Sequence, residues 1–90
     1  MTAIETITDE VTKLQPMYRV LLHNDDVNDM MHVSNAIQEV FHFDCDKANS
    51  IMMEAHNEGV ALCKIEPLEP AEFHQEQLQS FGLVSTIEPE

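Results

Sequence analysis

Residues 17–29 read MYRVLLHNDDVND, and this stretch decides the fold. Its first seven residues are mostly apolar and include strand-favouring types, so they predict a strand. The run 24–29 consists of turn-forming polar residues and ends that strand. Asp29 is then placed to cap a helix, because its carboxylate can accept hydrogen bonds from the first free backbone N–H groups.

Two helices are predicted after this turn. Apolar residues recur at helical spacing from Met30 to Phe41, which indicates an amphipathic helix. After a short break, Asp44 is the candidate N-cap of a second helix that extends to Glu58. Gly59 follows as its C-terminal cap, because glycine readily adopts the left-handed conformation that ends many helices.

The last third of the sequence predicts a strand, a helix and a strand. Residues 60–65 form the first of these strands, and 67–70 form a turn with Pro70 in the first turn of the helix. Gly82 ends this helix, and residues 83–87 form the last strand. The weak apolar face of the helix consists of Phe73, Leu78 and Phe81. The order β-α-α-β-α-β, with the helices on one face of three strands, predicts a two-layer α+β sandwich.

Length and composition predict a single domain. A chain of 90 residues, of which 43% are hydrophobic, can form one modest core. We expect residues 1–16, which are rich in Thr and acidic residues, to be a mobile extension and residues 17–90 to form the core domain. No apolar run is typical of a signal peptide or a membrane helix, so the expected location is the cytoplasm.

The charge of the chain disfavours several partners. Seventeen acidic residues against four basic ones give a formal net charge of −13. Nucleic acids and anionic membranes require basic patches, so neither is expected as a partner. Metal ions, basic peptides or amino groups fit such a chain better.

The cysteine and glycine content restricts the chemistry further. Cys45 and Cys63 are expected to be two buried thiols rather than a disulfide. The chain has only two glycines, which are too few for a glycine-rich nucleotide-binding loop.

The acidic turn 24–29 is the densest polar cluster, and three interpretations compete for it. As a calcium loop it fits poorly, because Asp29 stands where Gly is required and Asn35 where Glu is required. As a capped turn it presents its carboxylates to water. As a socket, its carboxylate and amide groups bind a cationic group such as an ammonium.

Histidines and methionines supply the remaining candidates. None of the five histidines has the HxxxH or HExxH spacing of zinc hydrolases. His56 borders an apolar helical face, four residues after Met52, where its ring can reach the edge of a pocket. The methionines of the two predicted helices form either ordinary core or a deformable apolar pocket. Because no nucleophile–base or paired-carboxylate arrangement is visible, we expect a small binding module without enzyme activity, cofactor or metal.

Together these residues resemble the ClpS family of adaptors, which deliver N-degron substrates to a Clp AAA+ unfoldase and its protease. The resemblance covers about residues 17–87 and rests on the strand followed by the NDD turn and on a Met-x-x-x-His-x-x-Gly helix. The C-terminal residues 82–90 are similar to the cyanobacterial and plastid branch. Outside residues 18–26, the matching positions are Met30, Val33, Ala48, Ile51, Met52, Ala55, His56 and Gly59.

The resemblance implies an antiparallel sheet of three strands with three helices, and it implies a binding site. The residues that hold the α-amino group of a substrate correspond to Asn24, Asp25 and His56. The pocket for the first side chain corresponds to Asn28, Met30, Val33, Met52, Ala55 and Leu83. Within this pocket, Met30 matches the gatekeeper that excludes β-branched side chains.

The resemblance also implies a protein partner. Glu69 and His74 correspond to contacts with the N-domain of the unfoldase, for which a ClpC type is favoured over a ClpA type. The N-terminal segment corresponds to the extension that the unfoldase engages.

Several positions depart from the family pattern. Ala55 stands where a larger aliphatic residue is usual, 27–29 replaces a Tyr-Thr-Pro-like stretch, and His74 replaces a basic residue. Two alternatives stay open: a ClpS-like paralogue that regulates the unfoldase without delivering degrons, and a metal-binding protein that uses the turn 24–29.

Overall fold

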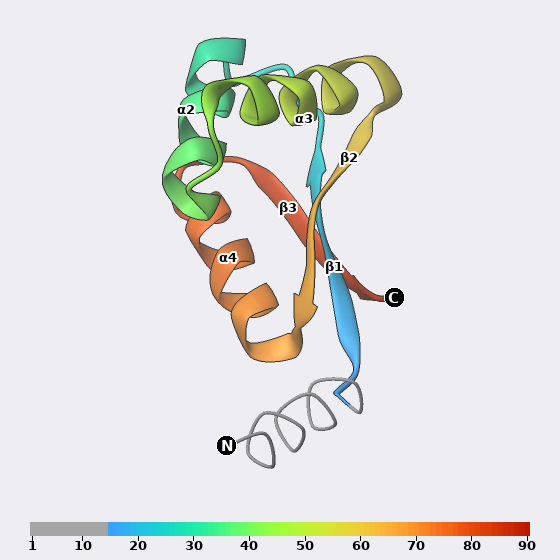
Figure 1. The fold of residues 1–90 in the computed structure, drawn as a ribbon. Helices are drawn as coiled ribbons and strands as arrows, with labels where there is room; N and C mark the ends of the chain where they lie inside the picture. Colours follow the sequence, from blue (N-terminus) through green and yellow to red (C-terminus); the bar gives the residue numbers. More distant parts are fainter. Residues whose placement is uncertain (1–14) are drawn as a thin grey trace.

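The computed structural model describes residues 15–90 and confirms the predicted element order (Figure 1). The predicted extension, residues 1–16, lies outside the described residues except for Gln15 and Pro16. The elements are β1 (Met17–His23), α2 (Met30–Phe41), α3 (Cys45–Glu58), β2 (Val60–Pro67), α4 (Leu68–Ser80) and β3 (Val84–Pro89).

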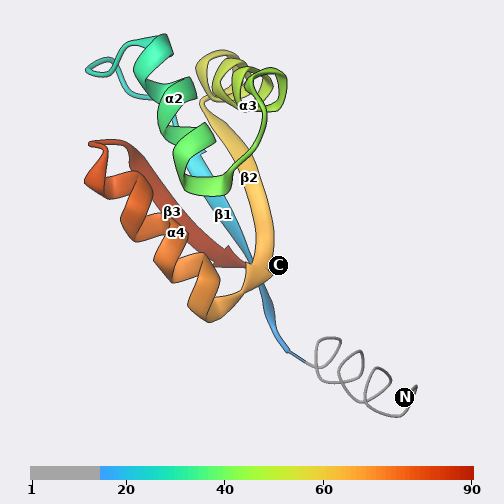
Figure 2. The same ribbon diagram turned by 60° about the vertical axis from the view of Figure 1, so that its left-hand side comes forward.

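The three strands form one antiparallel sheet in the order β2-β1-β3, so the first strand is the central one. His23, at the end of β1, pairs with Val60 on one side and Val84 on the other. The helices cover one face of this sheet: α4 lies along the strands, and α2 and α3 lie toward the end where β1 finishes (Figures 1 and 2). The two-layer α+β sandwich is therefore confirmed.

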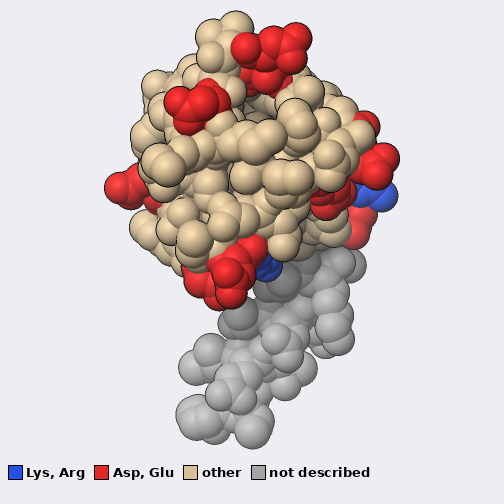
Figure 3. Space-filling model, turned by 90° about the horizontal axis from the view of Figure 1, so that it is seen from above, with Lys and Arg blue, Asp and Glu red and all other residues tan. Residues whose placement is uncertain are grey.

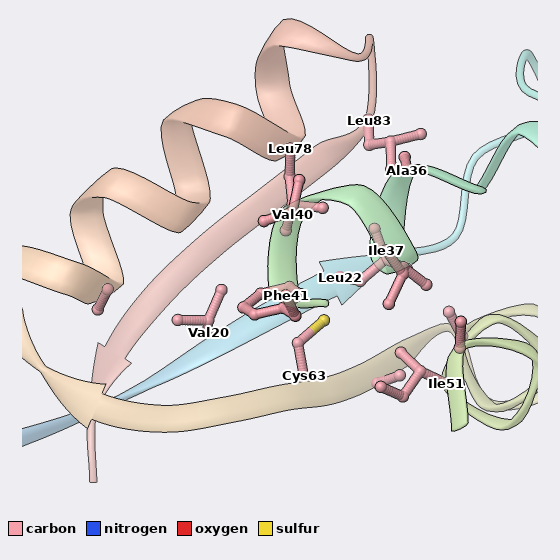
Figure 4. Packing of buried hydrophobic residues seen from close by; sticks show 14 residues of the cluster. Val20, Leu22, Ala36, Ile37, Val40, Phe41, Ile51, Cys63, Leu78 and Leu83 are labelled. Carbon is pink, nitrogen blue, oxygen red and sulfur yellow. The ribbon is translucent and has the colours of Figure 1, made fainter. Parts of the chain in front are cut away.

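The core lies between the sheet and the helices, because alternate strand residues face inward. Val20 and Leu22 of β1 are fully buried there against Ile37 of α2 and Leu78 of α4 (Figure 4). These apolar contacts hold the elements that frame the cavity described below.

The predicted helix caps are present. The Asp29 side chain accepts a hydrogen bond from the backbone N–H of His32 at 2.8 Å, and Asp44 accepts one from Lys47 at 2.8 Å. Gly59 has φ of +90°, which is the left-handed conformation expected at the end of α3.

The predicted turn at 67–70 is wrong. The strand β2 extends to Pro67, which pairs with Met17, and α4 begins at the next residue. A proline is tolerated there because β2 is an edge strand and Pro67 has an extended backbone. Pro70 does lie in the first turn of α4, as predicted. The last strand begins one residue late, at Val84.

Two predictions about burial are also wrong. Phe73 is 55% exposed, and the inward face of α4 instead consists of Ala71 and Leu78. Of the two free thiols only Cys63 is buried, while Cys45 is exposed at the first residue of α3. Burial, with a smaller effect of the Glu54 charge, raises the pKa of Cys63 to about 12, because a thiolate is poorly solvated in the core.

Candidate functional site

A cavity of about 390 Å³ opens between the turn 24–29, α2 and α3. Its wall combines polar groups from the turn with apolar side chains from the two helices. Eight of the nine residues predicted to bind a substrate line it: Asn24, Asp25, Asn28, Met30, Val33, Met52, Ala55 and His56.

Asn24 and His56 line the same cavity because Gly59, the residue between α3 and β2, bonds to both segments of the chain. The backbone N–H of Asn24 donates to the Gly59 carbonyl at 3.0 Å, which continues the pairing of β1 with β2. The Gly59 N–H in turn donates to the carbonyl of Ala55 at 2.9 Å and closes the end of α3. The last turns of α3, which carry His56, therefore lie beside the first residue of the acidic turn.

Asp25 is held as a carboxylate by its own turn. Its Oδ1 accepts hydrogen bonds from the backbone N–H groups of Val27 at 2.9 Å and Asn28 at 2.8 Å. The Asn28 backbone bond is the main reason that the pKa of Asp25 lies below its usual value of 3.8, and burial opposes this shift only in part. The group therefore carries a negative charge at neutral pH and faces the cavity.

The apolar part of the wall comes from both helices. Ala55 is buried, Val33 and Met52 are half-buried, and Met30 is 43% exposed at the entrance. The volume of the cavity and the flexible thioethers of Met30 and Met52 allow it to accept a large side chain.

Leu83, also predicted for this wall, is not among the residues that line the cavity. It is buried in the core, one residue before the last strand (Figure 4). Its role in a side-chain pocket stays a prediction.

The cavity has an electrostatic character that favours cations. Three carboxylates line it, from Asp25, Asp26 and Asp29, and neither Lys nor Arg does. Viewed from the α2–α3 end, acidic atoms are spread around this face, and Lys and Arg appear only at its margin (Figure 3). A ligand with a positive group at one end and an apolar body fits this distribution.

Sequence reasoning missed His23 and Leu22, which also line the cavity. His23 ends β1, and its Nε2 lies 2.7 Å from the Thr86 hydroxyl of β3. No local sequence pattern shows whether a strand residue lines a cavity, because this depends on which other elements pack beside the strand.

The two predicted unfoldase contacts lie on α4, away from this cavity. Glu69, near the start of α4, lines a second depression together with Tyr18, Pro67 and Leu68. His74, one turn later, binds Glu66 of β2.

Metal binding depends on the grouping of ligand side chains within residues 15–90, and membrane insertion depends on the length and hydropathy of the helices there. In this part of the chain, no group of three or more His, Cys, Asp or Glu side chains could hold a metal ion. None of its helices is long and apolar enough to cross a membrane.

Comparison with known proteins identifies the class. The family described as "ATP-dependent Clp protease adaptor protein ClpS" matches residues 13–86. The chain is 48% identical over 93 residues to the ClpS adapter of Synechococcus elongatus (strain ATCC 33912 / PCC 7942 / FACHB-805), covering 98% of each chain. It is 44% identical over 78 residues to chloroplastic CLPS1 of Chlamydomonas reinhardtii, covering 86% of this chain and 48% of that one.

A solved structure gives the same result. ClpS2 of Agrobacterium tumefaciens bound to L-phenylalaninamide superposes with a TM-score of 0.78 and 31% identity. The match covers 83% of this chain and 98% of that one. The chain therefore belongs to the ClpS family of Clp protease adaptors.

Proposed function

We propose that the cavity binds the first residue of N-degron substrates, which the protein then delivers to a Clp unfoldase. The observation that carries this proposal is that one cavity is lined both by the acceptor groups of Asn24, Asp25 and His56 and by apolar side chains. The Agrobacterium relative supports it, because phenylalaninamide has a free α-amino group and a large apolar side chain.

Each part of the cavity has a role in this proposal. An ammonium has three donors, which the Asp25 carboxylate, the Asn24 amide oxygen and an imidazole nitrogen of His56 can accept. Met30, Val33, Met52 and Ala55, with Asn28 beside them, surround the first side chain. Met30, half-exposed at the entrance, is the gatekeeper against β-branched side chains.

Two kinds of interaction favour this binding. A hydrogen bond to a charged group contributes about 1.5–3 kcal/mol. Burial of one Leu or Phe side chain contributes about another 1.5–3 kcal/mol. An internal Leu is rejected because it leaves the acceptors without a donor.

Calorimetry with Leu- and Phe-starting peptides, each free and N-acetylated, tests the proposal. We expect the free peptides to bind and the acetylated ones to bind at least 100-fold more weakly, because acetylation removes the charge and two donors. Asp25→Asn should weaken the free peptides, whereas Glu39→Gln, which removes an exposed charge on α2, should not. Equal binding of free and acetylated peptides would refute the proposal.

We further propose that α4 contacts the unfoldase N-domain through Glu69 and His74, and that the unfoldase is of the ClpC rather than the ClpA type. The choice of the ClpC type rests on the resemblance to the cyanobacterial and plastid branch, in which relatives of this chain are found. Binding assays with the isolated N-domains of both types test this, with Glu69→Ala as the variant. Tighter binding to the ClpA type would refute the choice.

The same proposal describes an adaptor core at residues 17–90 that acts without enzyme activity, in the cytoplasm, after an N-terminal extension that the unfoldase engages. The two alternatives have their own outcomes. Unfoldase binding without peptide binding would identify a regulator of the protease instead. A melting temperature that falls on addition of EDTA would identify a metal-binding protein.

A further inference from the structure

Two side chains connect the acidic turn and α2 to the corner where α4 meets β3. The Nδ2 of Asn28 donates a hydrogen bond to the Gly82 carbonyl at 2.9 Å. The Nε2 of His32 lies 2.7 Å from the Phe81 carbonyl. A carbonyl only accepts, so His32 must carry a proton on Nε2. Both bonds reach consecutive carbonyls just beyond α4, where no later turn of the helix supplies a donor.

The other side of Asn28 holds the carboxylate of Asp25. Its Nδ2 lies 3.3 Å from each Asp25 oxygen, and its backbone N–H donates to Oδ1 at 2.8 Å. Asn28 thus connects Asp25, the proposed amine-binding carboxylate, to the corner at Gly82. His32 secures the far end of the turn, because its backbone N–H is bonded to Asp29.

Apart from the Asn24–Gly59 backbone bond and the bond from the Val27 N–H to Asp25, the turn has little else to hold it in place. Val27, its one apolar residue, is 91% exposed, and Asp26 is also exposed. A surface turn without an apolar anchor keeps one conformation only when hydrogen bonds offset the loss of backbone entropy. Besides the Val27 N–H, Asn28 holds the Asp25 carboxylate, and His32 fixes the far end of the same turn, so the direction of this carboxylate depends on the bonds of both residues.

We propose that Asn28 and His32 are positioning residues of the amine-binding site, and that they hold Asp25 toward the substrate by fixing the turn to the Phe81–Gly82 corner. This inference rests on the proposed function. It assigns Asn28 a role different from that of a wall of the side-chain pocket. It adds His32, which no motif of the sequence indicated.

The test compares Asn28→Ala with Asn35→Ala, the same change at an exposed position of α2. We expect Asn28→Ala to lower the ratio of free to acetylated Phe-peptide affinity about tenfold, since one charge-assisted acceptor is misdirected. The pKa of Asp25, followed by NMR of its carboxyl carbon, should rise toward 3.8 because the side-chain bonds of Asn28 are lost. A purely structural role would not change this ratio in a folded variant.

A second pair of variants tests His32. His32→Gln retains an amide donor near the position of Nε2, so we expect its affinity ratio to stay within about twofold of the wild type. His32→Leu cannot donate and should lower the ratio several-fold. This pair decides the question if Asn28→Ala does not fold.

The outcomes separate the two proposals. If the wild type discriminates free from acetylated peptides, but folded Asn28→Ala and His32→Leu discriminate equally well, the positioning role is overturned and the proposed function stands. If the wild type does not discriminate, the proposed function itself fails.

Discussion

The ring of His74 lies with Nδ1 2.5 Å from Oε2 of Glu66, a residue that is only 5% exposed. Because a carboxylate accepts, the imidazole donates this hydrogen bond. The same ring packs against Phe41, at 4.8 Å between ring centroids. His74 therefore connects α4 to β2 and to the core, in addition to any contact with an unfoldase.

This pairing predicts that the two residues proposed for unfoldase contact behave differently. His74→Ala should lower the free energy of unfolding by about 1.5–3 kcal/mol, because it removes a hydrogen bond to a buried charged group. Glu69→Ala, at an exposed position, should change it by no more than about 0.5 kcal/mol. Urea denaturation measures both. Equal stability of the two variants would show that the Glu66–His74 bond is energetically unimportant.

Ala55 predicts a substrate preference. Its side chain is buried at the wall of the cavity, so Ala55→Val adds two methyl groups where a first side chain would lie. We expect affinity for Trp- and Phe-starting peptides to fall about tenfold more than affinity for Leu-starting ones, because one methylene in such a pocket changes binding by about 1–3 kcal/mol.

Ser50→Val is the control for this change, since Ser50 is exposed on the same helix and does not line the cavity. A calorimetric panel of peptides that differ only in the first residue measures the effect. An unchanged order and spacing of affinities in Ala55→Val would mean that Ala55 does not determine selectivity.

Asp25 predicts a pH dependence of stability. Its pKa in the folded protein is below 3.8, mainly because of the Asn28 backbone N–H, so the folded state favours the charged form. The stabilisation is complete above pH 3.8 and is lost as the pH falls through the lower folded pKa. Asp25→Asn should therefore lower the free energy of unfolding at neutral pH, and the difference should vanish in stronger acid.

Urea denaturation at several pH values measures this difference, with Glu39→Gln as the control for loss of one negative charge. A difference that is the same at all pH values would contradict a charge effect at Asp25.

The two thiols predict unequal reactivity. Cys45 is exposed, whereas burial keeps Cys63 out of reach and raises its pKa to about 12, so almost none of it is thiolate at neutral pH. We expect a thiol reagent to label one cysteine quickly in the folded protein and both in urea. Cys45→Ser should abolish the fast phase, and fast labelling of this variant would contradict the buried position of Cys63.

Most residues that line the cavity could be predicted from the sequence, because the NDD turn and the Met52–Gly59 helix carry specific family motifs. The anchoring of this turn could not. Asn28 and Gly82 are 54 residues apart, and their bond depends on where α4 ends relative to α2. No sequence motif indicated His32, because its ring bonds to the distant Phe81 carbonyl and is not among the family's binding residues.

By itself, the sequence determined the features that depend on neighbours along the chain: the strand before the turn, the caps at Asp29 and Asp44, and the end of α3 at Gly59. These rest on backbone preferences and on hydrogen bonds that span only a few residues.

The tertiary structure alone decided which faces are buried and which distant groups meet. It placed Phe73 in solvent, Leu83 in the core and Glu66 against His74. It also brought the carbonyl of Gly82 to Asn28. The physical reason is that burial and long-range hydrogen bonds depend on how the helices pack on the sheet, which no local pattern specifies.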